Sequence, residues 1–214
     1  MFIESSPVTT WSEEIKRPVI HPTAYIHHSA VLIGDVRIGK DVIICPGVVL
    51  RADEGSPIII GEGSNIQDRV IMHCLKGSSI EVGERCSIAH GAVIHGPCVL
   101  GRETFVGFNA VILDARLGGN CFVSHLALVS KVNLSGATFV PAGKILQSQA
   151  EADGLVKVSE GEKQFNNKVL SVNEELRRGY KNIHHLEIHH GQHRARIKRP
   201  GRELAEGKEA VTVG

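Results

Sequence analysis

An aliphatic residue recurs at every sixth position through most of residues 20–134. The first run is Ile20, Ile26, Leu32, Ile38, Ile44 and Leu50. After a four-residue insertion the pattern resumes at Ile60, Ile66 and Met72, and after a second insertion of that length at Val82, Ile88, Ile94, Leu100, Val106 and Ile112. It then slips by one residue and continues at Leu117, Val123 and Val129. A small residue often lies four positions later, and Gly often follows the aliphatic residue directly.

A period of six matches neither an α-helix nor a plain alternating strand. It predicts a solenoid with one hexad per short strand and three strands per coil, in which the aliphatic and small residues point inward. Gly and Asn suit the tight corners, where they adopt a positive φ at little cost. The alternative is a sandwich of ordinary alternating strands, which does not explain a phase kept over so many hexads. We therefore expect a mainly β chain, with an N-terminal arm at 1–18 and a parallel β-helix at 19–145.

The hexad pattern fades after Val129, and the segment 140–144 (VPAGK) is typical of a turn that ends the last coil. Residues 147–158 are expected to form a loop or short helix, and a longer helix begins near Ser159 or Phe165. The region 146–193 thus forms a loop and a C-terminal α-helix that packs along the outside of the β-helix. Residues 194–214 are polar and form a flexible tail.

Composition narrows the class of protein. The 214 residues carry a formal charge of +1 and only 4% aromatic residues. This balance favours neither a nucleic acid nor an anionic membrane as partner. No apolar run approaches the roughly 20 residues that span a bilayer, and the N-terminus lacks the pattern of a secretory signal. The five cysteines form no CxxC pair, which fits a reducing, cytoplasmic location. Cys86, Cys98 and Cys121 fall on the small inward position, and Cys74 is expected to face away from its neighbour His73.

Hexad phase converts sequence position into spatial position. Leu50, Met72 and Ile94 are three hexads apart, so they stack on one wall in consecutive coils. The residues that follow them, Arg51, His73 and His95, therefore form a column on the outer face, with neighbours about 4.8 Å apart. Two imidazoles at that spacing can share one metal ion.

His90 belongs to a different wall, where it stacks on Asp68. It does not easily complete the His73 and His95 pair within one chain. If three β-helices pack around a threefold axis, His90 reaches across to the histidine pair of its neighbour in a homotrimer. Three imidazoles with an open position form a catalytic zinc site, and iron(II) or cobalt accepts the same ligands. The alternative is that these are ordinary surface histidines.

Polar residues suited to metal-hydroxide chemistry lie near the histidines. The segment that contains Arg51, Asp53 and Glu54 lies just below His73, and Gln67 and Asp68 lie below His90. An Arg–Asp pair could link two subunits. Glu54 could accept a proton from metal-bound water, whose pKa falls towards 7 on zinc. Charges that serve solubility alone are the alternative for any one of these residues.

Three segments carry a family resemblance: RADEGSPIIIGEGSNIQDRVIMH (51–73), SIAHGAVIHGP (87–97) and PAGKILQSQAEAD (141–153). They resemble the gamma-class carbonic anhydrases and their carboxysomal relatives, and the likeness covers roughly residues 18–180. Ferripyochelin-binding-type and thioesterase-linked hexapeptide proteins share these histidines. The resemblance implies a left-handed β-helix and hydration of CO2 to bicarbonate by a metal-bound hydroxide.

Residue by residue, the resemblance assigns the metal ligands to His73, His90 and His95 and the proton-accepting glutamate to Glu54. It assigns the structural arginine–aspartate pair to Arg51 with either Asp53 or Asp68. The polar residues that line the site in the family correspond to Asn65, Gln67 and Asn166.

One position departs from the founding members of the family, which carry a long acidic loop and a proton-shuttling glutamate three residues after the first ligand. Here that position is Lys76, in a short loop. The departure favours an alternative function, a catalytically weak or inactive metal-binding subunit that serves assembly. Acyl transfer is the third hypothesis, because many hexapeptide proteins are acyltransferases. A group of C-terminal histidines could assist proton transfer or bind metal, although a solvated helix end explains them more simply: His184, His185, His189, His190 and His193.

Overall fold

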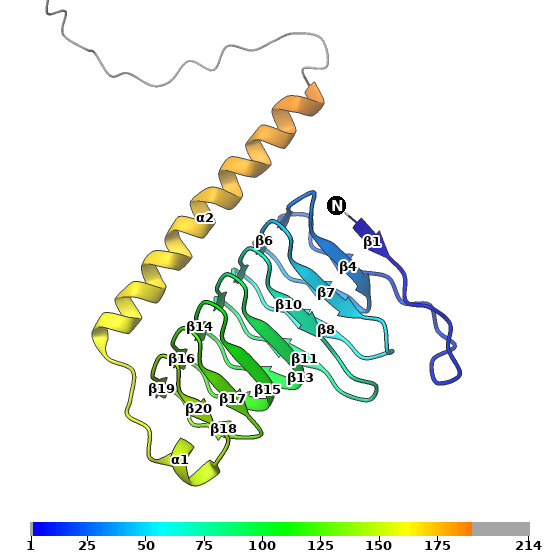
Figure 1. Ribbon diagram of the computed structural model, residues 1–214. Helices are drawn as coiled ribbons and strands as arrows, with labels where there is room; N and C mark the ends of the chain where they lie inside the picture. Colours follow the sequence, from blue (N-terminus) through cyan, green and yellow to red (C-terminus); the bar gives the residue numbers. More distant parts are fainter. Residues whose placement is uncertain (1, 190–214) are drawn as a thin grey trace, which may run out of the picture.

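The computed structural model describes residues 2–189, with side chains described as far as Ile183. It shows a parallel β-helix with a long helix along its side (Figure 1). The predicted polar tail and the C-terminal histidine side chains lie outside the described residues. The pairings between the named strands are parallel and arrange the strands as three walls.

The three walls take their strands in turn along the chain. Wall 1 contains β1 (Phe2–Glu4), β4 (Val31–Gly34), β7 (Val49–Ala52), β10 (Ile71–His73), the first parts of β13 (Val93–Leu100) and β15 (Val111–Leu117), β17 (Leu128–Ser130) and β20 (Ile145–Leu146). Wall 2 contains β2 (Val19–Ile20), β5 (Val36–Ile38), β8 (Ile58–Ile60), β11 (Ile80–Val82), the second parts of β13 and β15, and β18 (Asn133–Leu134). Wall 3 contains β3 (Tyr25–Ile26), β6 (Ile43–Ile44), β9 (Asn65–Ile66), β12 (Ser87–Ile88), β14 (Phe105–Val106), β16 (Phe122–Val123) and β19 (Phe139–Val140). The seven strands of wall 3 correspond to seven coils.

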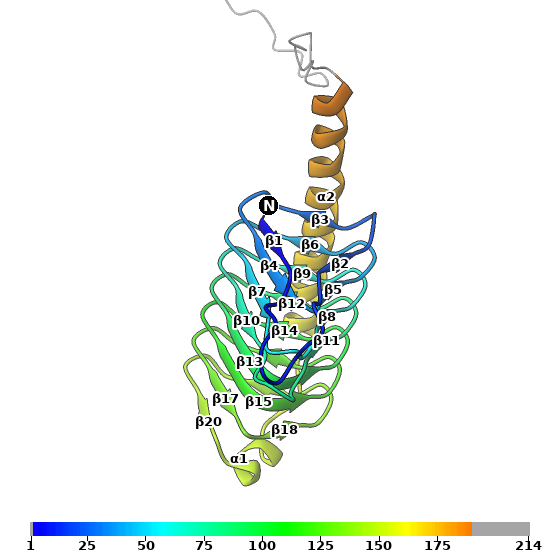
Figure 2. The same ribbon diagram turned by 90° about the vertical axis from the view of Figure 1, so that its right-hand side faces the viewer.

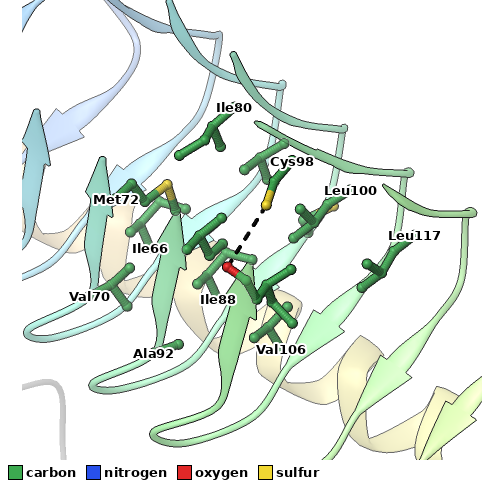
Figure 3. Close-up of a cluster of buried hydrophobic side chains, with 14 of the residues drawn as sticks. Ile66, Val70, Met72, Ile80, Ile88, Ala92, Cys98, Leu100, Val106 and Leu117 are labelled. Atoms are coloured by element: carbon green, nitrogen blue, oxygen red, sulfur yellow. Dashed lines mark hydrogen bonds between the residues drawn. The ribbon is translucent and has the colours of Figure 1, made fainter. Parts of the chain in front are cut away.

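The core runs through the centre of the coils, where the aliphatic residues of the hexads meet (Figure 3). Met72, Ile88 and Ile94 are fully buried, and burying a side chain of this size contributes about 1.5–3 kcal/mol. The predicted core cysteines Cys86, Cys98 and Cys121 are also buried, and so is Cys74, which was expected to face away from His73. Burial raises the pKa of the Cys86 thiol to about 12, so these cysteines act as small apolar core residues.

The corners of the coils differ from the prediction. Several residues with a positive φ are charged rather than Gly or Asn, including Arg69, Arg85 and Glu103. The left-handed conformation costs such residues about 1–2 kcal/mol. Each of the three donates its backbone N–H to the corner of the preceding coil, at Pro46, Glu62 and Glu84 respectively. Stacking of corners therefore supplies the hydrogen bonds that hold this conformation.

Helix α2 (Glu160–His189) lies along wall 3 and packs on β3, β6 and β12 (Figure 2). The predicted start near Ser159 is confirmed. The Glu162 carboxylate accepts a hydrogen bond from the Ser159 N–H at 2.9 Å, which satisfies a free backbone donor at the helix start. The expected short helix is α1 (Gln149–Asp153). Arg177 anchors α2 because it pairs with Asp41 at 3.2 Å and donates to the Thr23 carbonyl at 2.8 Å.

Two insertions project at the corner between walls 1 and 2. The segment 53–57 joins β7 to β8, and the segment 74–79 joins β10 to β11. The N-terminal arm begins with β1, which extends wall 1 by pairing with β4. The rest of the arm forms a loop before β2 that is drawn in dark blue in Figure 1.

Candidate metal centre

His73 and His95 lie side by side on wall 1, because β10 pairs with β13 and places the two residues opposite each other. His73 Nδ1 is 3.3 Å from His95 Nε2. The ring centroids are 5.2 Å apart, and the ring planes meet at 68°. The structure therefore brings together the two histidines that hexad counting assigns to one column.

The contact between Arg51 and His73 favours one assignment of protons to the ring nitrogens of this pair. Arg51 Nη2 is 2.9 Å from His73 Nε2, and a guanidinium only donates, so Nε2 accepts. His73 then donates from Nδ1 to His95 Nε2. This leaves the N–H on His95 Nδ1, which is buried and has no hydrogen-bond partner among the described residues. A buried N–H without an acceptor costs about 1–3 kcal/mol, so the pair is not satisfied on its own.

The same two rings fit a metal ion. Two nitrogens bound to one tetrahedral zinc at about 2.0–2.1 Å lie about 3.3–3.4 Å apart, which matches the distance between His73 Nδ1 and His95 Nε2. Burial is the main cause that lowers the pKa of His73, and the Arg51 charge lowers it further. A neutral imidazole is the form that binds a metal. Distances and charge state therefore suit two of the three ligands of a metal site.

Carboxylates surround the outer edge of His73. Glu54 Oε1 is 3.3 Å from His73 Nε2, and Asp53 Oδ1 is 3.7 Å from the same atom. Asp53 also lies 3.4 Å from Arg51 Nε. The backbone N–H of Lys76 donates to Glu54 Oε2 at 2.8 Å, so the two insertions meet at this carboxylate. Arg51, Asp53, Glu54, His73 and His95 therefore form one cluster, the column half of the site.

His90 belongs to a second cluster, on wall 3. Its Nδ1 lies 2.8 Å from Asp68 Oδ2, and its ring packs 5.3 Å from the Phe108 ring. An aspartate that accepts the Nδ1 proton leaves Nε2 as the nitrogen that can bind a metal. Half of the His90 side chain is exposed, so this nitrogen is accessible to another molecule.

Asn65 and Gln67 lie beside His90 on wall 3. Gln67 Nε2 donates to Asn65 Oδ1 at 2.9 Å, and Asn65 Nδ2 donates to Ser87 Oγ at 3.0 Å. These bonds use the nitrogens of both amides and leave the Gln67 oxygen as the group available to a ligand. Gln67, Asp68 and His90 line a groove of about 490 Å³ between wall 3 and α2, and the rest of its lining is largely apolar. We call Asn65, Gln67, Asp68 and His90 the groove half.

The two halves belong to different walls of the same β-helix. Within the described part of the chain, no group of three or more His, Cys, Asp or Glu side chains could hold a metal ion. His90 is therefore not brought to His73 and His95 within one chain, in agreement with the hexad count. A three-histidine site requires the column half of one copy and the groove half of another.

Comparisons with known proteins agree with these features. The family model described as "Bacterial transferase hexapeptide (six repeats)" matches residues 17–52. A carbonic anhydrase of Methanosarcina thermophila is 37% identical over 200 residues, which cover 84% of this chain and 81% of that protein. The chain belongs to the gamma-class carbonic anhydrase family of hexapeptide-repeat proteins. The expected fold, a parallel β-helix with a C-terminal helix, is confirmed.

Two further relatives in this family's wider group are informative. The carboxysome assembly protein CcmM of a Nostoc species is 39% identical over 186 residues. The match covers 82% of this chain but 34% of CcmM, so the chain spans about a third of the length of that relative. A solved hexapeptide transferase family protein from Anaplasma phagocytophilum superposes with a TM-score of 0.68 at 29% identity, covering 77% of this chain and 93% of that one. Neither helix in the described residues is long and apolar enough to cross a membrane.

The structure does not bring Asn166 to either half of the candidate site. Asn166 is buried at the edge of wall 3, where its Nδ2 donates to the Glu103 carbonyl at 3.1 Å. Asn173 instead lines the groove beside His90, and the sequence analysis missed it. The two asparagines are seven residues apart on α2. Seven residues are nearly two turns, so helix phase cannot distinguish them.

A row of apolar side chains on wall 1 was also missed. Each member directly precedes an inward aliphatic residue, so the hexad phase contains the signal. The strand register aligns them as a continuous outer row: Val31, Val49, Ile71, Val93, Val111, Leu128 and Ile145. We call this the aliphatic row, and it runs beside the histidine column. The equivalent row on wall 2 is mixed and largely polar: Arg37, Ile59, Glu81, Val99, Arg116 and Asn133.

Proposed function

We propose that this protein is a carbonic anhydrase, a metal-dependent carbonate dehydratase that catalyses the reversible hydration of CO2 to bicarbonate. The observation that carries the proposal is the pair of half-sites. His73 and His95 are 3.3 Å apart on one wall, and His90 is oriented by Asp68 on another. The relative named carbonic anhydrase, at 37% identity over most of both chains, supports the same reaction.

The site would form between adjacent subunits of a homotrimer. In the aliphatic row, Ile71 is 46% exposed and Ile145 is 62% exposed. A continuous apolar surface of this kind is typical of an interface. It lies beside the column half, and the groove that contains His90 is mainly apolar as well. Packing wall 1 of one copy against wall 3 of the next buries both surfaces and completes the ligand set. Cyclic closure repeats the contact at every subunit.

Zinc is the proposed ion, with iron(II) and cobalt as alternatives, held by His73 and His95 of one subunit and His90 of its neighbour. When bound, the ion supplies Lewis acidity and lets water give up a proton near neutral pH. Asp68 keeps His90 oriented, and Arg51 lies where it can pair with a carboxylate, Asp53 within the chain or Asp68 across the interface.

The remaining residues handle the proton and the substrate. Hydration joins CO2 and water to give bicarbonate and one proton. Glu54 is the proposed acceptor of this proton, because its carboxylate belongs to the column half and is held by the backbone N–H of Lys76. Gln67, positioned by Asn65, offers an amide oxygen to the bound water or to bicarbonate. The apolar groove lining excludes bulk water from CO2.

The test combines metal content with catalysis. We expect about one metal ion per chain in anaerobically purified protein, and CO2 hydration in stopped flow above the buffer rate. His73→Ala and His90→Ala should each lose both. His21→Ala is the matched control, because His21 is an exposed histidine in the first coil. Metal-loaded trimer without activity above buffer would refute the proposal.

One observation favours a second candidate, a metal-binding subunit that serves assembly without efficient catalysis. Lys76 occupies the place of the shuttle glutamate, and its side chain has no carboxylate partner among the described residues. The likeness to CcmM is consistent with this role. Full metal occupancy, a stable trimer and no hydration activity would support it. Acyl transfer is a weaker hypothesis than these two, because it needs a histidine base and not a set of metal ligands. A content of one metal ion per chain would count against it.

A further inference from the structure

The N-terminal arm forms a closed loop between β1 and β2. At its base, the Ser6 N–H donates to the Lys16 carbonyl at 2.8 Å, and the Lys16 N–H donates to Ser6 Oγ at 2.9 Å. At its end, Thr9 and Ser12 pair through their backbones and close a tight turn. We call residues 9–12 the arm tip. Its position is therefore set by hydrogen bonds within the arm and by the pairing of β1 with β4.

The arm tip rests on both insertions at the corner of walls 1 and 2. The Lys76 ammonium lies 5.6 Å from the centroid of the Trp11 ring, within the range of a cation–π contact. Ser12 packs against Gly55 so closely that a β-carbon on Gly55 would lie 3.2 Å from Ser12 Oγ. Ser12 thus contacts the first insertion, and Trp11 contacts the second.

These contacts lead directly to Glu54. Gly55 follows Glu54 in the first insertion, and the Lys76 N–H in the second insertion donates to Glu54 Oε2 at 2.8 Å. The other carboxylate oxygen is 3.3 Å from His73 Nε2. Within the second insertion, Gly77 has a positive φ and nothing packs within 4 Å of its missing β-carbon. The Trp11 contact therefore adds a restraint at residues 75–77, the exposed part of this insertion.

We propose that Trp11 is a positioning residue of the site, which holds the 74–79 insertion through Lys76 and thereby fixes the Glu54 carboxylate beside His73. This inference rests on the proposed function for its effect on the reaction. In place of a shuttle carboxylate, the lysine side chain serves as the attachment point of the arm. The restraint requires both the aromatic face of Trp11 and the ammonium group of Lys76. The hydrogen bond from the backbone N–H of Lys76 to Glu54 does not depend on the lysine side chain.

The experiment uses the full metal-loaded chain with three variants, Trp11→Ala, Trp11→Phe and Val8→Ala. Val8 is the control, because it is an exposed apolar residue of the same arm. An exposed cation–π contact is worth about 0.5–1 kcal/mol, which corresponds to about a two- to fivefold change. Trp11→Ala should lower kcat by that factor with KM for CO2 unchanged. Trp11→Phe should restore most of kcat, because it keeps an aromatic face.

Two further readouts do not depend on activity. Hydrogen exchange of the Lys76 amide should be faster in Trp11→Ala than in Val8→Ala, because that amide holds Glu54. Trp11 is the only tryptophan in the sequence, so its emission reports the contact directly, and Lys76→Met should shift it. Equal kcat and equal Lys76 exchange in Trp11→Ala and Val8→Ala would overturn the inference. If the wild-type protein binds metal but is inactive, the proposed function fails, and the exchange comparison alone decides whether Trp11 positions the insertion.

Discussion

His73 and His95 hold their ring nitrogens 3.3 Å apart because β10 and β13 pair in register across one coil. The same column continues with Arg51 on one side and Leu113 on the other. A guanidinium and a leucine cannot bind a metal ion, so the column provides two ligands and no third. This sequence of residues along one column explains why the candidate site needs His90 from another wall and therefore from another copy.

The aliphatic row predicts which substitution separates the subunits. Val93→Asp places a charge on the outer face of wall 1, beside His95, and should convert the proposed trimer to monomer. Val99→Asp is a matched control, because Val99 lies on the same strand but on wall 2. Light scattering after size-exclusion chromatography measures both. A Val93→Asp protein that stays trimeric would show that wall 1 is not the interface.

Arg177 predicts how strongly α2 is held on wall 3. Its side chain is 9% exposed, and its guanidinium pairs with Glu174 at 2.8 Å and Asp41 at 3.2 Å. Arg177→Met should cost about 2 kcal/mol, a value reduced for the partial exposure of both carboxylates, and lower the Tm by about 4–8 °C. Arg178→Met, which removes an exposed partner of the same Glu174, should change the Tm by less than about 2 °C. Equal losses in the two variants would contradict a specific anchor.

Glu174 gives this anchor a dependence on pH. The hydrogen bond from Arg177 is the main cause that lowers the pKa of Glu174 below 4.5. Below pH 4.5 the unfolded chain therefore takes up a proton that the folded chain does not, and the free energy of unfolding falls as the pH drops through the lowered pKa. Above that window the contribution is complete. The Tm of the wild type should fall more steeply than that of Glu174→Gln between about pH 5 and pH 3. Parallel curves would contradict this.

The hexad period was sufficient to predict the walls, the core and the stacking of His73 on His95. The reason is that a solenoid converts sequence separation into spatial separation by a fixed rule, so a local pattern determines a long-range contact. The insertions did not disturb this count because they project at a corner and leave the strands in register on either side. The start of α2 was predicted near Ser159 or Phe165, and the helix begins at Glu160, next to the first of these.

Contacts outside the repeat could not be predicted in this way. Nothing in the hexads indicates where α2 crosses wall 3, so Asn166 could not be distinguished from Asn173. The Trp11 and Lys76 contact joins an arm without a repeat to an insertion without a repeat. The aliphatic row was encoded in the hexads, but its importance depends on what packs against wall 1, which a single chain does not contain.

Mixed trimers test the shared site directly. His73→Ala and His90→Ala subunits, purified separately, should each bind no more than traces of metal, because each removes a ligand from every interface. When two such chains, differently tagged, are co-expressed in equal amounts, an interface is complete only where a subunit with an intact column half meets a neighbour with an intact groove half. Random assembly gives this combination at about one quarter of the interfaces. Metal content and hydration activity should therefore recover to about a quarter of the wild-type values, whereas a site built within one chain would stay empty in every mixture.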